Sequence, residues 1–482
     1  MHLRIITRFI AILVLFLGIS MALPLLASLI YKDGSTWALL LSTLITSGIG
    51  LIVSLATKGN QNNHLSHRDG IAIVTLGWIM AGLFGTLPYL FSGHIQDFTN
   101  AYFESLSGFT TTGASILSNI ESIPKGILLW RSQTQWLGGM GIIVLSIAIL
   151  PFLGVGGMQL YKAEIPSPVV DKLKPRISET AKTLWKVYLL LTVLEIVLLF
   201  AGGMSIFDGI CHAFCTMPTG GFSTKNGSIA QFGSPYFDVI IIIFMLFAGI
   251  NFSLHYRLIK GDIRVFGKDP ECRIFLLLVI VFILIVTLNI YGSVYGSLSK
   301  AFRYAAFQVS SIITTTGFVT ADYDKWPALS KHILLFCMFL GAMAGSTGGG
   351  MKIMRVMLLI RHGYHEIFRL IHPHAVTTVK VGGKPVPAHI LSSIWGFFIL
   401  YLGLFIVATL VMASLGLDMV SALASVAASI GNIGPGLGIV GPVQNYLSIP
   451  VTGKWILIFC MLLGRLEIYT VIILLVPEYW RK

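Results

Sequence analysis

Four glycine-rich stretches carry the residues of this sequence whose types and spacing could do chemistry. Each ends in a turn that combines glycine with threonine, asparagine or proline, and no turn has a carboxylate at its glycine. Backbone carbonyls of such turns can replace the hydration shell of a small cation. Glycine suits them because it lacks Cβ and takes positive φ readily. The stretches are AYFESLSGFTTTGAS (101–115), GICHAFCTMPTGGFS (209–223), AAFQVSSIITTTGFVT (305–320) and ALASVAASIGNIGPGLG (422–438).

The four stretches align with Gly113, Gly221, Gly317 and Gly434 in register, at intervals of 108, 96 and 117 residues. The segment of about ten residues ahead of each glycine spans roughly 15 Å if helical, which is too short to cross a bilayer. We therefore expect re-entrant half-helices. A helical hairpin with a glycine cap would explain one such stretch, but four in register favour turns that converge on one path for a monovalent cation. Acidic rings for a divalent cation are not in the pattern.

Nine residues ahead of each glycine stands a polar side chain, and the four are Glu104, His212, Gln308 and Ser425. These side chains could bind ions directly. The commoner role of such a residue is to brace a binding site by hydrogen-bonding its backbone.

The elements that carry these turns must lie in a membrane. Of the 482 residues 55% are hydrophobic and 11% are charged, against roughly 25% charged residues in soluble domains. This composition excludes a soluble enzyme and a disordered chain, and the net charge of +13 forms no aromatic-interleaved patch for nucleic acid. Ten apolar runs predict an all-α polytopic membrane protein, with spans near 9–31, 37–57, 70–92, 126–152, 183–204, 237–256, 274–292, 332–361, 389–415 and 455–477.

Basic residues divide unequally between the two sides of these spans. With Lys186, one side holds 23 of the 33 Lys and Arg residues, so we expect it to be cytoplasmic, with both chain ends inside. The stretches on that side are 1–8, 58–69, 153–182, 257–273, 352–388 and 478–482.

The eighth span is interrupted by GAMAGSTGGGMK (341–352). Three consecutive glycines weaken a helix by roughly 1 kcal/mol each. The stretch lacks the spacing of a phosphate-binding loop. The interruption is therefore either a simple helix kink or a break in the helix that serves a function. In the last span, Arg465 lies 11 residues beyond Lys454, hence roughly 16 Å along a helix and near mid-bilayer. A charge there is costly and marks a functional candidate, or a structural ion pair or carbonyl contact.

Longer motifs accompany the four turns. They include GGMGIIVLSIAILPFLGVGGMQLYKAE (138–164), GGFST (220–224), TTTGF (314–318), AGSTGGGMK (344–352), NIGPGLG (432–438) and GRLEIYT (464–470). Together with the turns they make the whole chain resemble the Trk/Ktr/HKT superfamily of potassium transporters, and within it the bacterial TrkH-type subunits.

The resemblance implies four pseudo-symmetric membrane–pore–membrane repeats around one ion path, like those of a K+ channel. It also implies a homodimer and a separate cytoplasmic ring of nucleotide-binding regulatory subunits of the TrkA type, through which alone nucleotide acts. The implied division of the chain is a two-helix N-terminal domain at 1–62, then pore repeats at 63–175, 176–265, 266–372 (with a gating loop) and 373–482.

The resemblance also assigns an ion-binding filter of three residues per turn. In this superfamily, glycine at the first-repeat position accompanies potassium permeation and serine accompanies sodium, so Gly113 favours K+ as the transported ion, with no other cofactor. The carbonyls expected to bind K+ are those of the first two residues in each set. The sets are Thr111, Thr112 and Gly113; Thr219, Gly220 and Gly221; Thr315, Thr316 and Gly317; and Asn432, Ile433 and Gly434.

The interrupted span becomes, by the same resemblance, a loop that obstructs the path below the filter until the cytoplasmic partner moves it. We thus expect potassium uptake across the bacterial cytoplasmic (inner) membrane through a gated pore. K+/H+ or K+/Na+ symport by the same site is the alternative. An enzyme is not expected, because the sequence has no HExxH or serine–histidine pairing. The gate residues are Gly345, Ser346, Thr347, Gly348, Gly349, Gly350, Lys352 and Arg465.

Overall fold

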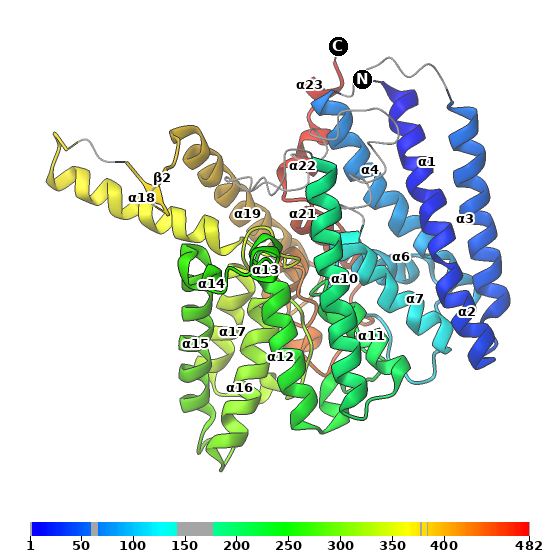
Figure 1. Ribbon diagram of the computed structural model, residues 1–482, viewed down its shortest axis with the longest axis horizontal. Coiled ribbons are helices and arrows are strands. Elements are labelled where there is room, and N and C mark those ends of the chain that lie inside the picture. The colour runs from blue at the N-terminus through cyan, green and yellow to red at the C-terminus, as the bar shows by residue number, and fades with distance from the viewer. Residues whose placement is uncertain (1, 59–65, 142–176, 376–377, 383, 482) are drawn as a thin grey trace.

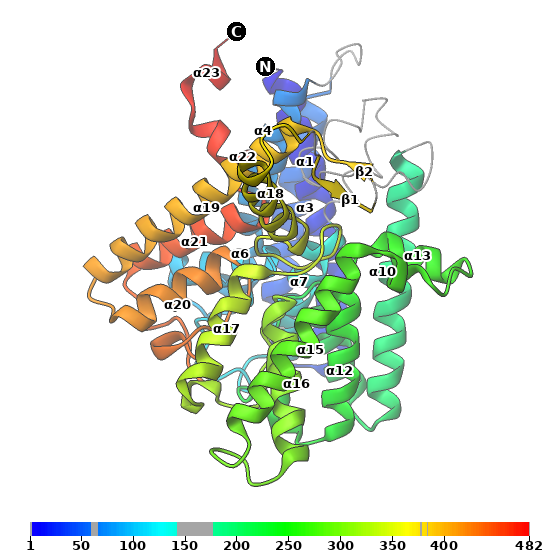
Figure 2. The same ribbon diagram turned by 90° about the vertical axis from the view of Figure 1, so that its left-hand side faces the viewer.

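The computed structural model describes residues 2–58, 66–141, 177–375, 378–382 and 384–481. Over these ranges the chain is almost entirely helical (Figure 1), apart from loops and one small antiparallel hairpin, in which β1 (Lys380–Val381) pairs with β2 (Lys384–Pro385). The two ends of the chain lie at the same end of the molecule in both views (Figures 1 and 2).

Six helical spans within the described ranges are long and apolar enough to cross a membrane. Many of their large apolar side chains are exposed, Ile52 on α3 by 67% and Leu288 on α15 by 70%, as suits helices that face lipid. The spans comprise α1 (Leu3–Ser20) with α2 (Ala22–Tyr31), α3 (Thr36–Ala56), α4 (His67–Gly85) with α5 (Leu87–Phe91), α10 (Ile177–Ala201), α15 (Pro270–Ile290) and α19 (Ala388–Ser414).

Two bent helix pairs raise this number to eight if each is one span. The helices α12 (Pro235–Gly249) and α13 (Phe252–Ile259) meet at 105°, and α21 (Val451–Arg465) meets the segment that begins with α22 (Tyr469–Ile472) at 114°. The sequence predicted one helical span near 237–256 and another near 455–477, and the structure bends both.

Local backbone chemistry explains both bends. At the first, the Asn251 side chain caps α13 by accepting a hydrogen bond from the N–H of Ser253 (2.9 Å), which ends one helix and starts another. At the second, Glu467 and Ile468 take left-handed φ angles of 59° and 52°. Neither residue type signals such a break in a sequence.

The remaining predicted spans are interrupted or only partly described. Helix α7 (Lys125–Trp136) continues into a π-helical turn, Leu137–Gly141, and the rest of the predicted span 126–152 lies outside the described residues. Helix α17 (Ala328–Leu340) is followed by an irregular loop at 341–352 and then by α18 (Ile353–Ile371), which projects away from the body (Figure 1). Two further short helices are α14 (Val265–Lys268) and α23 (Pro477–Trp480).

Four shorter helices, which we call the turn helices, each lead into one of the glycine-rich turns. Each packs against the helix that follows the previous turn in a cyclic order: α6 on α21, α11 on α7, α16 on α12 and α20 on α17. This order brings the ends of the four turn helices together in the interior. They are α6 (Phe98–Phe109), α11 (Ile206–Thr216), α16 (Leu298–Ile313) and α20 (Met419–Ile430).

Candidate ion pathway

The four turns share an unusual backbone conformation. In each, a non-glycine residue takes a left-handed φ between 53° and 59°, and the glycine two positions later takes a positive φ between 77° and 94°. Left-handed φ is uncommon for threonine, so its recurrence in three turns, with asparagine in the fourth, reflects a common construction. The non-glycine residues are Thr111, Thr219, Thr315 and Asn432, and the glycines are Gly113, Gly221, Gly317 and Gly434.

Each turn also folds back onto the end of its own helix. In the first turn, the N–H of Thr112 donates to the carbonyl of Ser107 (2.9 Å), five residues earlier. The other three turns repeat this bond at 2.8 Å, from Gly220 to Cys215, from Thr316 to Ser311 and from Ile433 to Ala428. Because the N–H groups point back at the helices, the carbonyls of the turns remain available for another partner.

The eight carbonyls assigned to K+ binding are nearly all without a hydrogen-bond donor. Within the described part of the chain, only the carbonyl of Gly220 accepts a bond, from Nε2 of Gln135 (2.7 Å). Gln135 also accepts from the N–H of Phe222 (3.1 Å), so its amide holds the second turn from α7. A buried carbonyl without a partner is costly, which makes these groups candidates for binding a cation.

The register glycines join the four turns into a closed circle. A Cβ at Gly113 would lie 2.0 Å from the carbonyl oxygen of Gly220 in the second turn. The same contact leads from Gly221 to Thr316 (2.0 Å), from Gly317 to Ile433 (1.9 Å) and from Gly434 back to Thr112 (2.7 Å). Each glycine therefore lies directly against a carbonyl of the next turn, which leaves no room for a side chain. The four turns surround one axis.

Buried side-chain oxygens lie in the first and fourth turns, and Oδ1 of Asn432 is close to the 341–352 loop, 3.1 Å from the position of a Cβ at Gly349. Oγ1 of Thr111 and Oδ1 of Asn432 are buried and have no hydrogen-bond partner among the described residues. Nδ2 of Asn432 donates to Oγ1 of Thr112 (2.9 Å) and to the carbonyl of Met461 (2.9 Å). The fourth turn is thus tied to the first by a side chain that threonine could not supply.

Polar side chains behind the turns act mainly as braces. Glu104 accepts from Oγ of Ser115 (3.0 Å) and from the N–H of Ile116 (2.9 Å), just beyond the first turn. Nε2 of His212 lies 3.0 Å from Oγ of Ser223, and the amide of Gln308 lies 3.2 Å from Oγ1 of Thr320. In the fourth repeat, Ser425 differs, because its hydroxyl donates to its own helix at Ala422 (3.1 Å).

Arg131 was not singled out from the sequence as a site residue, yet it connects two repeats. Its Nε donates to Glu104 (2.7 Å), and its Nη1 donates to the carbonyl of Ser223 (2.9 Å) beyond the second turn. Both charged side chains are almost completely buried. A charged residue within a predicted membrane span was the signal that could have identified Arg131.

The 341–352 loop lies directly against the circle of turns. The N–H of Gly349 donates to Oγ1 of Thr315 (2.7 Å). A Cβ at Gly348 would lie 3.0 Å from the carbonyl of Thr314, and one at Gly349 would lie 2.4 Å from the carbonyl of Gly431. The loop therefore contacts the third and fourth turns, and its glycines allow the approach. Gly350, with φ of 71°, turns the chain away toward α18.

The other loop residues contact the surrounding helices. Gly345 accepts at its carbonyl from the N–H of Phe252 (3.1 Å), and Ser346 donates to Met343 (2.6 Å). Thr347 donates through Oγ1 to the carbonyl of Met217 (2.9 Å), beside the second turn.

Arg465 contacts backbone carbonyls of two separate segments. Its Nη1 donates to the carbonyl of Thr347 in the loop (2.8 Å), and its Nη2 donates to the carbonyls of Gly138 and Gly139 (2.7 Å each) at the π-helical turn. The ammonium of Lys352 contacts the carbonyl of Gly348 within the loop itself. All eight gate residues thus belong to, or touch, one loop under the circle of turns.

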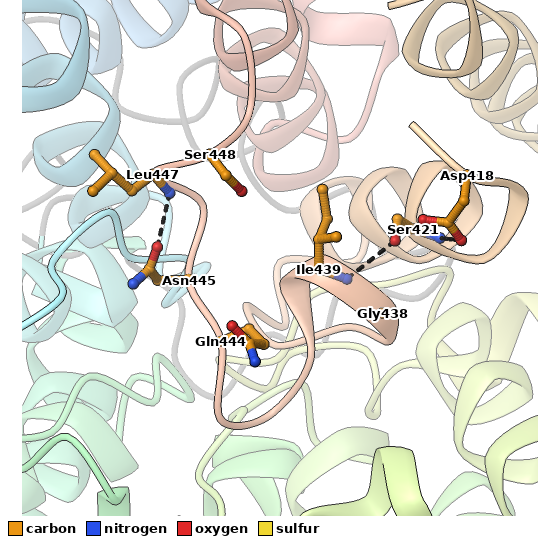
Figure 3. A pocket seen from close by; sticks show the side chains of 8 residues that line it. All are labelled: Asp418, Ser421, Gly438, Ile439, Gln444, Asn445, Leu447 and Ser448. Atoms are coloured by element: carbon orange, nitrogen blue, oxygen red, sulfur yellow. Dashed lines mark hydrogen bonds between the residues drawn. The ribbon is translucent and has the colours of Figure 1, made fainter. Parts of the chain in front are cut away.

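A separate cavity of about 570 Å³ lies beside the first turn of α20 (Figure 3). Its one carboxylate, Asp418, caps α20 by accepting from the N–H groups of Val420 (3.1 Å) and Ser421 (3.2 Å). None of the assigned filter or gate residues lines it, so the cavity is not part of the candidate pathway.

The chain is similar to known cation transport proteins in both sequence and structure. The family model TrkH, described as "Cation transport protein", matches residues 43–482. "Trk system potassium uptake protein TrkH" of Salmonella typhimurium is 45% identical over 490 residues, covering 100% of both chains. "Trk system potassium uptake protein TrkG" of Escherichia coli is 37% identical, covering 100% of this chain and 99% of that one. The crystal structure of the potassium transporter TrkH from Vibrio parahaemolyticus superposes with a TM-score of 0.89 at 40% identity, covering 100% of both chains.

Proposed function

The chain belongs to the TrkH family of cation transport proteins, and from this premise we propose that it takes up K+ across a cell membrane through the circle of turns. It is a transport protein and not an enzyme. The observation that carries the proposal is the closed sequence of glycine–carbonyl contacts that runs through all four turns. Such a circle supplies oxygen ligands at one axis without a carboxylate, which suits a monovalent cation.

In this proposal the K+ ligands are the carbonyls of Thr111, Thr112, Thr219, Gly220, Thr315, Thr316, Asn432 and Ile433. Seven of these eight carbonyls accept no hydrogen bond within the described residues, which supports the assignment. The Gly220 carbonyl shares its oxygen with Gln135. We therefore expect the second turn to bind the ion more weakly than the others.

The 341–352 loop is the gate. Its contact with the inner end of the third and fourth turns supports this role, because an ion that leaves the filter at that end must pass the loop. Arg465 and Lys352 hold the loop through the Thr347 and Gly348 carbonyls. Their positive charges also disfavour a cation at the same place.

The proposed architecture has ten transmembrane helices and four re-entrant helices, in a two-helix domain at 1–62 and repeats at 63–175, 176–265, 266–372 and 373–482. The cyclic packing of each turn helix on the helix that follows the previous turn supports the repeats. We propose that the chain lies in the bacterial inner membrane with both ends cytoplasmic, forms a homodimer, and is opened by a cytoplasmic nucleotide-binding ring of TrkA-type subunits.

Reconstituted flux tests this function. Purified protein in liposomes, without a regulatory ring, should pass K+ or Rb+ slowly and in preference to Na+. A variant with residues 346–350 shortened should pass K+ faster with unchanged K+/Na+ preference. Absence of K+ flux in both proteins, at a fixed membrane potential and pH gradient, would refute the pore; equal flux in both would refute the gate alone.

A further inference from the structure

A buried carboxyl at the start of α15 lies at the base of the 341–352 loop. Glu271 is 2% exposed, and its Oε1 accepts two hydrogen bonds from chain segments more than 70 residues away. One comes from the N–H of Ala344 (2.8 Å) and the other from the N–H of Met354 (3.0 Å). A single oxygen atom thus joins the segment that enters the loop to the helix that leaves it.

Glu271 is not needed to cap its own helix. The N-terminal cap of α15 is Asp269, whose carboxylate accepts from the N–H of Cys272 (2.8 Å). Glu271 instead serves α18, whose preceding residue, Lys352, makes no side-chain cap and has φ of 69°. The first N–H groups of a helix lack partners within it and favour a nearby carboxylate. Glu271 therefore caps α18 from another helix.

Backbone contacts close the base of the loop at the same level. The N–H of Met351 donates to the carbonyl of Phe339 (3.2 Å), and the N–H of Ile353 donates to the carbonyl of Ala342 (3.1 Å). These bonds hold the loop closed on itself, so that Gly348 and Gly349 point at the circle of turns. Glu271 fastens this closed base to α15.

Movement of helix α18 can release the closed base of the 341–352 loop. From Ile353 onward it runs out of the body, as Figure 1 shows from the side and Figure 2 nearly end-on. A displacement of α18 acts first on its amino end, where Met354 is bound to Glu271. Loss of this bond detaches the start of α18 from Glu271, which then holds only the Ala344 side of the loop.

We propose that Glu271 is a positioning residue that latches the 341–352 loop against the filter, and that the pathway opens when displacement of α18 breaks the Glu271–Met354 contact. The inference rests on the proposed function of the loop as a gate. A residue of α15, outside the loop itself, then takes part in gating.

The test measures K+ flux in liposomes that lack the regulatory ring. Glu271→Ala removes the acceptor of both hydrogen bonds. We expect this loss to shift the equilibrium between the closed and the open loop about tenfold, and K+ flux to rise by the same factor. Glu271→Gln keeps Oε1 and should remain near wild type. Asp269→Ala is the matched control, because it removes a cap of the same helix without touching the loop.

A second arm separates a latch from a structural defect. In protein with 346–350 shortened, Glu271→Ala should add little further flux, because the latch then has nothing to hold. If Glu271→Ala does not yield folded protein, Glu271→Asp carries the test, since the shorter side chain withdraws the oxygen and should raise flux less strongly. Wild-type flux in Glu271→Ala, or in Glu271→Asp where it stands in, overturns the latch. Absence of K+ flux in every protein, including the shortened one, overturns the pore.

Discussion

The N–H of Gly349 donates a hydrogen bond of 2.7 Å to Oγ1 of Thr315. Gly349 belongs to the loop that interrupts the eighth predicted span, and Thr315 is the left-handed residue of the third turn. The loop therefore binds the third turn directly rather than lying some distance below it. As long as this bond exists, one of the threonine hydroxyl oxygens at the inner end faces a backbone N–H and not an ion.

Replacement of Thr315 by valine should loosen the loop. The variant loses the acceptor for Gly349, and we expect basal K+ flux in liposomes to rise about fivefold, since a neutral hydrogen bond contributes roughly 1 kcal/mol. Thr315→Ser keeps the hydroxyl and should behave like wild type. Thr219→Val is the matched control, because the Thr219 hydroxyl donates to Pro218 and has no bond to the loop; a rise in that variant as well would assign the effect to the filter.

Replacement of Gly113 by serine should reduce K+ over Na+ preference. A Cβ there would lie 2.0 Å from the carbonyl oxygen of Gly220, and φ at Gly113 is 77°, so the second turn must move. We expect the K+/Na+ permeability ratio to fall at least tenfold. Gly93→Ser is the control, since Gly93 has a similar φ of 72° but no atom within 4 Å of a Cβ. An unchanged ratio in Gly113→Ser would contradict the assignment of the filter.

Replacement of Arg465 by alanine should speed permeation. The change removes the bond to Thr347 and a positive charge beside the loop. Because a hydrogen bond from a charged group is worth roughly 1.5–3 kcal/mol, we expect K+ flux to rise by about tenfold or more. Lys454→Ala on the same helix is the control, because Lys454 contacts Asn100 and Leu447 and does not touch the loop. Slower flux from folded Arg465→Ala would refute this role.

Replacement of Arg131 by methionine should destabilise the protein. Glu104 then remains buried without its partner, which costs about 3–5 kcal/mol for an ion pair broken on one side. We expect a clearly lower midpoint of thermal unfolding in detergent. Arg257→Met breaks an exposed pair with Asp262 and should change the free energy of unfolding by less than about 1 kcal/mol. Equal midpoints of thermal unfolding in Arg131→Met and Arg257→Met would show that the Arg131–Glu104 ion pair does not stabilise the fold.

The sequence predicted the class of fold and the family because both depend on patterns along the chain. Apolar runs identify helices such as α3 and α19, and the resemblance to TrkH-type proteins is confirmed by the family match over residues 43–482. The register of Gly113, Gly221, Gly317 and Gly434 located the turns, because only glycine permits both the positive φ and the close approach found there.

Contacts between distant segments could not be predicted in the same way. The bracing of the second turn by Gln135 and the capping of α18 by Glu271 depend on which helices lie side by side. Single residue types carry no such information. The role of the four turns in binding K+ stays a prediction, supported by their geometry.

The contact between the fourth and the first turn closes the circle of turns. Neighbouring repeats along the chain are also joined by their own backbone, whereas the fourth meets the first through noncovalent contacts alone, including the bond from Asn432 to Thr112. A Cβ at Gly434 would lie 2.7 Å from the carbonyl oxygen of Thr112, against 1.9–2.0 Å for a Cβ at the other three register glycines. Because the fourth turn meets the first through these contacts alone, we expect the circle to widen first between Gly434 and Thr112.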